Sequence, residues 1–143
     1  KSFVYHPTYE EVRRLIMNKQ PTTSEIEILN VLWEKESTTV REVFEIISTT
    51  KPVTYTTILK LMQIMTEKGL VERDVEGKAH LYRATIAQTE TQKGLVNELL
   101  EKVFRGSAMQ LVQHILDNKK TSPEEMKEIR KMINKVEKEA KDE

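Results

Sequence analysis

The segment 54–83 constrains the fold most, because a helical pattern is followed at once by a hairpin pattern. Gly69 predicts the end of the helix. Two short stretches of alternating polarity follow, 70–73 and 79–83, and Gly77 between them permits the positive φ of a tight turn. The apolar residues of the helix recur at i, i+3, i+4 and i+7, the spacing of an amphipathic helix: Ile58, Leu61, Met62 and Met65.

Two more helices are expected before this segment. Thr22, Thr23 and Ser24 are N-cap candidates for the first helix, and Ser24 with Glu27 matches a capping box, which predicts that the helix starts there. Residues 37–39 break that helix and are expected to form a three-residue strand. The second helix is predicted to end before Pro52, because a proline biases the preceding residue away from the α region. Three helices followed by a hairpin predict a winged helix-turn-helix domain over residues 21–86.

From residue 88 onward the pattern predicts three further helices, each with an apolar stripe, and Ser122-Pro123 signals the start of the last one. Three such helices in about 55 residues cannot cover their own stripes, so we expect a second copy of the chain to cover them. The predicted dimerisation residues are Leu95, Leu99, Leu100, Val103, Phe104, Leu111, Val112, Ile115, Ile129 and Ile133.

The expected fold is therefore mostly α with a small β-wing. Residues 1–20 are an N-terminal extension in which a short helix is predicted from Tyr9, residues 21–86 form the winged-helix domain, and residues 87–143 form a helical dimerisation domain. A protein of 143 residues is long enough for such a pair of parts.

Composition excludes several other classes. No cysteine is present, so disulfides, thiolate catalysis and cysteine-based metal sites are excluded. The three histidines lie far apart without metalloprotease spacing, and no phosphate-binding or nucleophile motif is found, so we expect no enzyme, metal site or cofactor. No apolar stretch predicts a transmembrane helix or a signal peptide, and we expect a cytoplasmic protein without membrane insertion.

The charge distribution favours the segment 54–83 as a nucleic-acid-binding surface, although the net charge of the chain is zero. Residues 21–50 carry six glutamates against two basic residues. Residues 51–83 instead carry six basic residues against four acids. This modest basic excess lies on the helix and hairpin that would face double-stranded DNA.

The predicted DNA-binding residues fall into three groups by position. The start of the third helix is expected to approach a phosphate, because helix N-termini favour anions. Its exposed face is expected to read base edges in the major groove, and the hairpin to contact the flanking backbone. The groups are Thr54, Tyr55, Thr56 and Thr57; Leu59, Lys60 and Gln63 together with Thr56; and Arg73, Lys78 and His80.

Two other interpretations stay open from the residues alone. The polar face of the helix and the charges of His80 and Arg73 fit a merely solvated surface about as well. A winged helix can also serve as a protein–protein interaction module, which the neutral net charge fits. A basic strip along Lys60, Arg73 and Lys78 would favour DNA, whereas an apolar or acidic strip would favour a protein partner.

The stretches SEIEILNVLWEKESTTVREVFEII and TYTTILKLMQIMTEKGLVERDVEGKAHLYRA, followed by NELLEKVFRGSAMQLVQHIL and SPEEMKEIRKMI, resemble the BlaI/MecI/CopY family of bacterial repressors. The resemblance covers about residues 22–136 and leaves the first 20 residues outside it. It implies a homodimer that represses genes by binding palindromic operators, through an N-terminal winged helix and a C-terminal dimerisation domain.

The resemblance also implies a means of release. In the β-lactam branch of the family, a membrane sensor-protease pathway leads to cleavage at an Asn-Phe dipeptide in the first dimerisation helix. The matching position here is Glu98-Leu99, so this candidate switch position departs from the family pattern. The copper branch uses C-terminal cysteine ligands, which this chain lacks.

Overall fold

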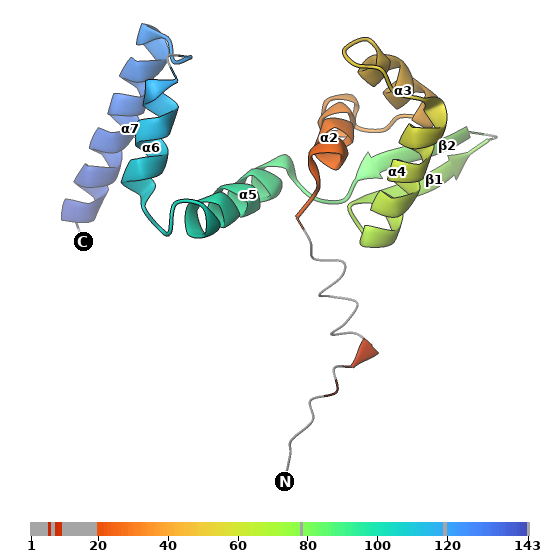
Figure 1. The fold of residues 1–143 in the computed structure, drawn as a ribbon, viewed down its shortest axis with the longest axis horizontal. Helices are drawn as coiled ribbons and strands as arrows, with labels where there is room; N and C mark the ends of the chain where they lie inside the picture. The colour runs from red at the N-terminus through yellow and green to blue at the C-terminus, as the bar shows by residue number, and fades with distance from the viewer. Residues whose placement is uncertain (1–5, 7, 10–19, 78, 119, 143) are drawn as a thin grey trace. The chain divides into compact units, whose positions relative to one another are not determined.

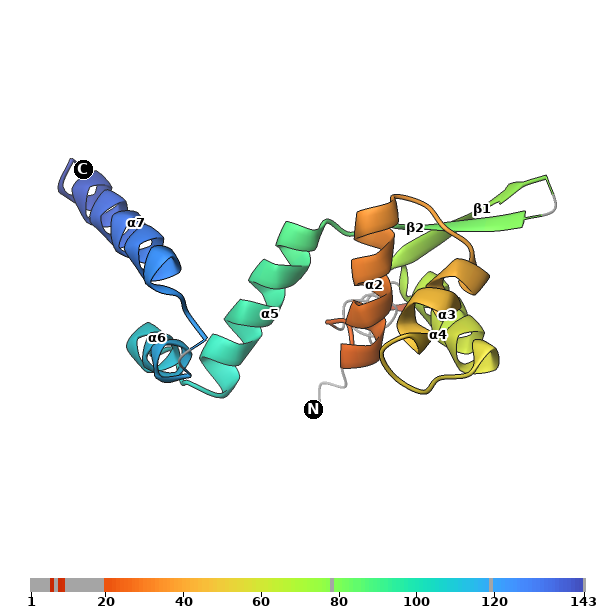
Figure 2. The same ribbon diagram turned by 90° about the horizontal axis from the view of Figure 1, so that it is seen from above.

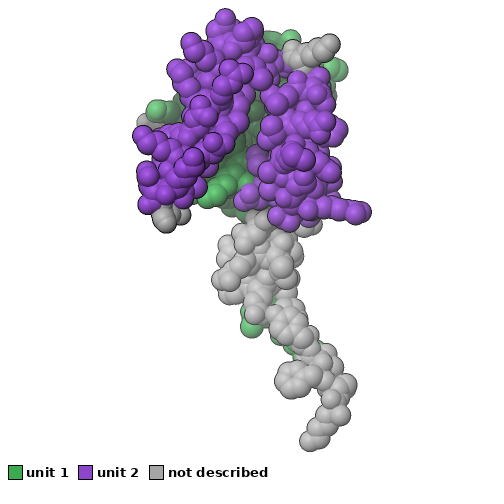
Figure 3. Space-filling model, turned by 90° about the vertical axis from the view of Figure 1, so that its left-hand side faces the viewer, with its two compact units in different colours: residues 1–95 green, residues 96–143 purple. Residues whose placement is uncertain are grey.

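The computed structural model describes residues 6, 8, 9, 20–77, 79–118 and 120–142. It divides into two compact units, residues 1–95 and residues 96–143, which Figure 3 shows in different colours. The helix predicted from Tyr9 lies mostly outside the described residues, as does Lys78 at the predicted hairpin tip. The mostly helical fold with one small antiparallel sheet is confirmed.

The described residues of unit 1 form three complete helices and a hairpin in the predicted order (Figure 1). A further helix begins in this unit and continues into the next. The elements are α2 (Thr23–Lys35), α3 (Val40–Ser48), α4 (Tyr55–Lys68), β1 (Val71–Glu76), β2 (Ala79–Ala84) and α5 (Gln88–Lys102). Figure 2 shows the outer part of the hairpin extending beyond the three helices.

Local signals set most of the helix ends. Thr54 caps α4 by accepting a hydrogen bond from the N–H of Thr57, close to the predicted helix start, and Gly69 ends the helix in the left-handed region at φ 80°, as predicted. The capping box of α2 is different from the predicted one. Thr22 and Glu25 form it, two residues before Ser24 and Glu27.

The core of unit 1 lies between α2, α3, α4 and the inner part of the hairpin. Ile28, Leu29 and Leu32 of α2 are buried against residues such as Met62 and Met65 of α4. The indole N–H of Trp33 donates to the carbonyl of Ile86 at 2.9 Å, which ties the segment after the hairpin to α2. This core fixes α4 against the rest of the unit and leaves its other face open.

The predicted strand at 37–39 is reduced to a single bridge. The N–H of Thr38 donates to the carbonyl of Tyr82 at 3.0 Å, and the N–H of Tyr82 donates back at 2.8 Å. Strands β1 and β2 are antiparallel, with Arg73 opposite Tyr82 and Glu72 opposite Arg83. The start of α3 is therefore tied by its backbone to the wing.

Unit 2 contains the end of α5, α6 (Ala108–Asp117) and α7 (Pro123–Lys141). Arg105 and Gly106 adopt positive φ between α5 and α6, and Ser122 caps α7 with Pro123 in its first turn, as the sequence predicts. None of its described residues is buried. The large apolar side chains exposed there are Val96, Leu99, Val103, Met109, Val112, Ile115, Leu116, Met132, Ile133 and Val136.

Candidate nucleic-acid interface

The face of α4 that turns away from the core is polar. Ile58, Met62 and Met65 are buried, as their spacing predicts. Thr56, Lys60 and Gln63 are exposed on the other side of the helix, and Leu59 beside them is half-buried. α4 therefore offers hydrogen-bonding and charged groups along one continuous side.

The first turn of α4 uses two of its hydroxyl groups internally. The hydroxyls of Thr54 and Thr57 lie 2.8 Å apart, and the Thr54 oxygen also accepts the N–H of Thr57. The N–H groups of Tyr55 and Thr56 have no acceptor within the helix, because the first residues of an α-helix have no preceding turn. These two backbone N–H groups can therefore donate hydrogen bonds to a phosphate.

A groove of about 400 Å³ lies between α3, α4 and the hairpin. It brings Tyr55, Leu59 and Gln63 of α4 together with Arg73 and His80 of the wing, so half of the predicted DNA-binding residues share one surface. Thr56, Thr57 and Lys60 are exposed on α4 but do not line it. The complete lining is Thr39, Val40, Arg41, Tyr55, Leu59, Gln63, Arg73, Ala79, His80 and Tyr82.

Strand register explains which wing charges reach the groove. Alternate residues of a strand point to opposite faces. Arg73 and His80 share a face with the buried Tyr82, which packs toward the helices. Arg83 lies on the other face, where its guanidinium pairs with Glu72 and, at 3.3 Å, with Asp74. The predicted residues Arg73 and His80 are thus separated from a neighbouring arginine whose charge is already paired.

Sequence reasoning missed the contribution of α3. Thr39, Val40 and Arg41, in and before the first turn of this helix, line the groove beside Tyr55. The guanidinium carbon of Arg41 lies 5.5 Å from the centroid of the Tyr55 ring. A signal was available, because the helix before a recognition helix crosses the DNA backbone in helix-turn-helix proteins and its exposed basic residues are candidates for contact.

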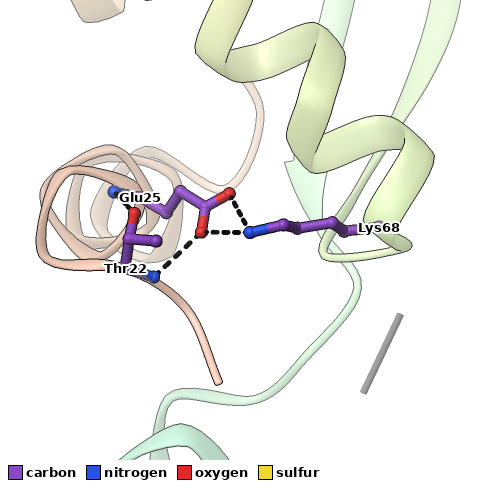
Figure 4. Close-up of polar contacts among 3 residues, drawn as sticks. All are labelled: Thr22, Glu25 and Lys68. Carbon is purple, nitrogen blue, oxygen red and sulfur yellow. Dashed lines mark hydrogen bonds and ion pairs between the residues drawn. The ribbon is translucent and has the colours of Figure 1, made fainter. Parts of the chain in front are cut away.

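A buried ion pair holds the far end of α4 against the start of α2 (Figure 4). The ammonium group of Lys68 lies 2.8 and 3.0 Å from the two carboxylate oxygens of Glu25, which is only 1% exposed. The same carboxylate accepts the N–H of Thr22 at 2.9 Å. Burial disfavours the charged form of Glu25, but the hydrogen bonds from Lys68 and Thr22 outweigh it and lower the pKa of the carboxyl below its ordinary value.

The capping box of α2 begins at Thr22 because of this pair. Only Glu25 reaches both the backbone of Thr22 and the side chain of Lys68, whereas Glu27 pairs with Lys51 at 2.8 Å. The position of the capping box is therefore set by two long-range ion pairs. Lys68 is 43 residues from Glu25, and Lys51 is 24 residues from Glu27.

Eight of the predicted dimerisation residues lie on α5, α6 and α7, whereas Val103 and Phe104 lie in the turn after α5, which ends at Lys102. Leu99, Val103, Val112, Ile115 and Ile133 are exposed, and the remaining five are half-buried. The rings of Phe104 and His114 lie 5.5 Å apart and join the end of α5 to α6. Glu98, beside Leu99, pairs with Lys102 at 2.9 Å along the helix.

Other kinds of site find no support in the part of the chain that the structure describes. No group of three or more histidine, aspartate or glutamate side chains there could hold a metal ion. None of the helices in the same residues combines the length and apolar character needed to cross a bilayer.

A three-helix domain with a hairpin wing, whose polar helix face opens into a groove beside basic side chains, defines a winged helix-turn-helix protein. The chain belongs to the penicillinase repressor family, whose model matches residues 21–135. It is 24% identical over 114 residues to the methicillin resistance regulatory protein MecI of Staphylococcus aureus strain N315, covering 80% of this chain and 93% of MecI. The penicillinase repressor of Bacillus licheniformis is 25% identical over 119 residues, or 82% of this chain and 93% of that repressor.

Among solved structures, a mutant MarR from E. coli complexed with operator DNA aligns at a TM-score of 0.49 and 15% identity, covering 89% of this chain and 86% of MarR. A likeness at this level supports no conclusion about function. The family assignment rests on the match over residues 21–135 and confirms the resemblance in the sequence.

Proposed function

We propose that the chain is a sequence-specific DNA-binding repressor that acts as a homodimer on palindromic operators. The observation that carries this proposal is the groove that joins the polar face of α4 to the basic side chains of the wing. The chain also belongs to a family whose members include penicillinase repressors, which supports the same function.

Base reading is assigned to the exposed face of α4. A helix fits the major groove of B-form DNA, where glutamine can pair with adenine and lysine with guanine. Lys60 and Gln63 are exposed on this face, with Thr56 one turn before Lys60. The half-buried Leu59 supplies an apolar contact for a thymine methyl group.

Backbone contacts are assigned to the wing and to the start of α4. Arg73 and His80 line the groove, and Lys78 follows Gly77 in the sequence. Each phosphate neutralised adds about −0.9 to the slope of log affinity against log salt concentration. Binding should therefore weaken steeply with salt even though the net charge of the chain is zero.

Homodimer formation is assigned to the helices of unit 2. Its described residues form no buried core, and many of its large apolar side chains, such as Val103 and Val136, are exposed in a single chain. A second copy related by a two-fold axis would cover the same side chains on both chains at once. Two winged helices held in this way match two half-sites of a palindrome.

The alternative function, a protein–protein interaction module, fits the groove less well. The cores of protein interfaces are depleted in charged residues. Here Arg41, Arg73 and His80 line the groove and Lys60 is exposed on the same helix as Tyr55. The described lining of the groove combines apolar side chains with these three basic ones and contains no acidic residue, which favours DNA.

Release by a membrane sensor-protease pathway stays a prediction of the family resemblance. The candidate position, Glu98-Leu99, lies inside α5, with Glu98 paired to Lys102. Cleavage there would require the helix to open locally, because a helical backbone makes its hydrogen bonds internally. A stable fragment ending at Glu98 in cells exposed to a β-lactam would support this route, and an intact chain in derepressed cells would contradict it.

Selection from random DNA duplexes, read by sequencing and followed by footprinting, tests the proposed function. We expect the full chain to enrich a palindromic sequence and to protect two symmetric half-sites. If no duplex is retained above the nonspecific level at moderate salt, the proposed function fails. If a protein partner is captured and no DNA is bound, the alternative function takes its place.

A further inference from the structure

Arg41 lies in the first turn of α3, where that helix meets the wing. The backbone of Thr38 pairs with Tyr82 of β2, and the hydroxyl of Thr39 caps α3 by accepting the N–H of Glu42 at 3.2 Å. Val40 is buried next to Arg41, which is exposed. The backbone that carries Arg41 is therefore held against the hairpin, and its side chain lies in the wall of the groove.

The Tyr55 ring supports the guanidinium group of Arg41. The guanidinium carbon lies 5.5 Å from the centroid of this ring, within the range of a cation–π contact. The ring of Phe44 meets the Tyr55 ring edge to face at 5.9 Å and an interplanar angle of 82°. Arg41 and Phe44 of α3 thus both contact Tyr55, the first residue of α4, and the ring contact uses none of the hydrogen-bond donors of the guanidinium group.

Arg41, like Arg73 in the same groove, has no carboxylate partner among the described residues. Within the described residues it forms no ion pair, whereas Arg83 on the outer face of the wing pairs with both Glu72 and Asp74. The acid next to Arg41, Glu42, accepts a hydrogen bond from the Thr38 hydroxyl. A positive charge that is oriented by a ring and not neutralised is suited to an external anion.

We propose that Arg41 binds a phosphate group of the operator backbone at the edge of the groove, and that Tyr55 positions it for this contact. The proposal rests on the proposed function, and it adds a residue of α3 to the contacts of α4 and the wing. The planar guanidinium matches two phosphate oxygens at once, which a lysine cannot do. A contact of this kind adds affinity for every sequence and carries no sequence information.

The test is a salt titration of duplex affinity with the full chain and the duplex selected by it. Arg41→Gln keeps most of the aliphatic stem and removes the charge. We expect it to weaken binding to the selected duplex and to an unrelated duplex alike, by about tenfold at moderate salt, and to reduce the log–log slope by about 0.9 for each copy of the chain on the duplex, or about 1.8 for a homodimer. Arg83→Gln is the matched control, and it should leave both slope and affinity near those of the unmodified protein.

The positioning role of Tyr55 is tested by a double-mutant cycle. Tyr55→Leu keeps an apolar side chain and removes the ring, so part of its effect should disappear in the Arg41→Gln background. Arg41→Lys keeps the positive charge, and it replaces Arg41→Gln in the salt titration if Arg41→Gln lowers the melting temperature. It should retain the slope while losing affinity, because the ammonium group cannot hold two oxygens.

The outcomes separate the two proposals. An unmodified protein that retains no duplex overturns the proposed function and this inference with it. A protein that binds its selected duplex, with an unchanged slope in Arg41→Gln or an equal loss in Arg83→Gln, overturns the assignment of Arg41 alone. Additive effects of Tyr55→Leu and Arg41→Gln overturn the positioning role.

Discussion

The two units of this chain differ in how they bury apolar surface. In unit 1 the helices α2, α3 and α4 enclose a core in which Leu29, Val43 and Met62 are fully buried. In the described residues of unit 2 no side chain is buried, and Val103 and Val136 are each 64% exposed. The same chain therefore combines a part that satisfies its own apolar residues with a part that needs another surface.

This difference predicts that the stabilities of the two units depend differently on protein concentration. The stability of unit 1 comes from packing within one chain and should not depend on protein concentration. The stability of unit 2 is tied to association, so it should rise with concentration, as for any partner that binds the folded state only. Variants in the two units should differ in this respect, even where the residue types match.

The largest effect is expected from the core of unit 1. Leu29→Ala should lower the free energy of unfolding by about 2–5 kcal/mol at any protein concentration, because it leaves a cavity in a closed core. Leu99→Ala, at a leucine that is 41% exposed on α5, is the matched control. Its effect on the urea midpoint should depend on protein concentration. Equal, concentration-independent losses in both variants would remove the contrast between the units.

The next largest effect is expected at the predicted dimer interface. Leu99→Asp would place an unpaired charge among apolar side chains and should weaken association by about 2–4 kcal/mol. Sedimentation equilibrium measures this change, and operator affinity should fall with it while unit 1 keeps its melting temperature. Asn97→Asp adds the same charge at an exposed position off the apolar stripe and should leave the dimer intact. An unchanged dimer in Leu99→Asp would refute the assignment.

A third effect separates the choice of sequence from the strength of binding. Lys60→Ala and Gln63→Ala should each relax sequence preference by about 1–3 kcal/mol per lost base contact. Lys78→Ala should weaken binding to all sequences about alike, as variants in unit 2 should. Competition between the selected duplex and single-base variants measures the preference. The same loss of preference in all three variants would contradict this division of roles.

The smallest effect concerns the ion pair that anchors α4 within unit 1. Glu25→Gln should cost about 1–2 kcal/mol of unfolding free energy at neutral pH, at the low end for a buried pair because Lys68 is partly exposed. The pKa of Glu25 is lowered in the folded state, so its charge stabilises the fold above the ordinary glutamate pKa. This stability should be lost as the pH falls below about 4.3 and then through the folded pKa.

Urea titrations of the unmodified protein and Glu25→Gln at several pH values measure this dependence. The gap between their unfolding free energies should close as the solution becomes acidic. Glu27→Gln removes an acid from the exposed pair with Lys51, so it should show a much smaller gap. A gap at Glu25 that is constant with pH would show that the carboxylate charge does not contribute.

Local signals in the sequence predicted much of the fold. Thr54, Gly69 and Ser122 act within one turn of the helix ends that they mark, and the apolar spacing of α4 depends on helical geometry alone. The expected capping box at Ser24 was wrong for the opposite reason. Both Ser24 with Glu27 and Thr22 with Glu25 match a capping box, and the long-range contact between Glu25 and Lys68 favours the box that starts at Thr22.

The candidate site shows the same limit. Sequence reasoning selected Arg73 and His80, which line the groove, and left out the paired Arg83, but it gave no reason for that choice and did not select Arg41. These distinctions depend on strand register and on the meeting of α3 with α4. Neither can be obtained from residue types, because each needs the positions of segments that are distant in the chain.

The sequence by itself determined the order of helices and strands, the polar face of α4 and the excess of apolar surface in the C-terminal helices. These properties follow from periodicity and capping within a few residues. Only the tertiary structure decided which cations stand unpaired at the groove. The charge of an arginine is available or neutralised according to its neighbours in space, and for Arg41 these are the Tyr55 ring and the wing.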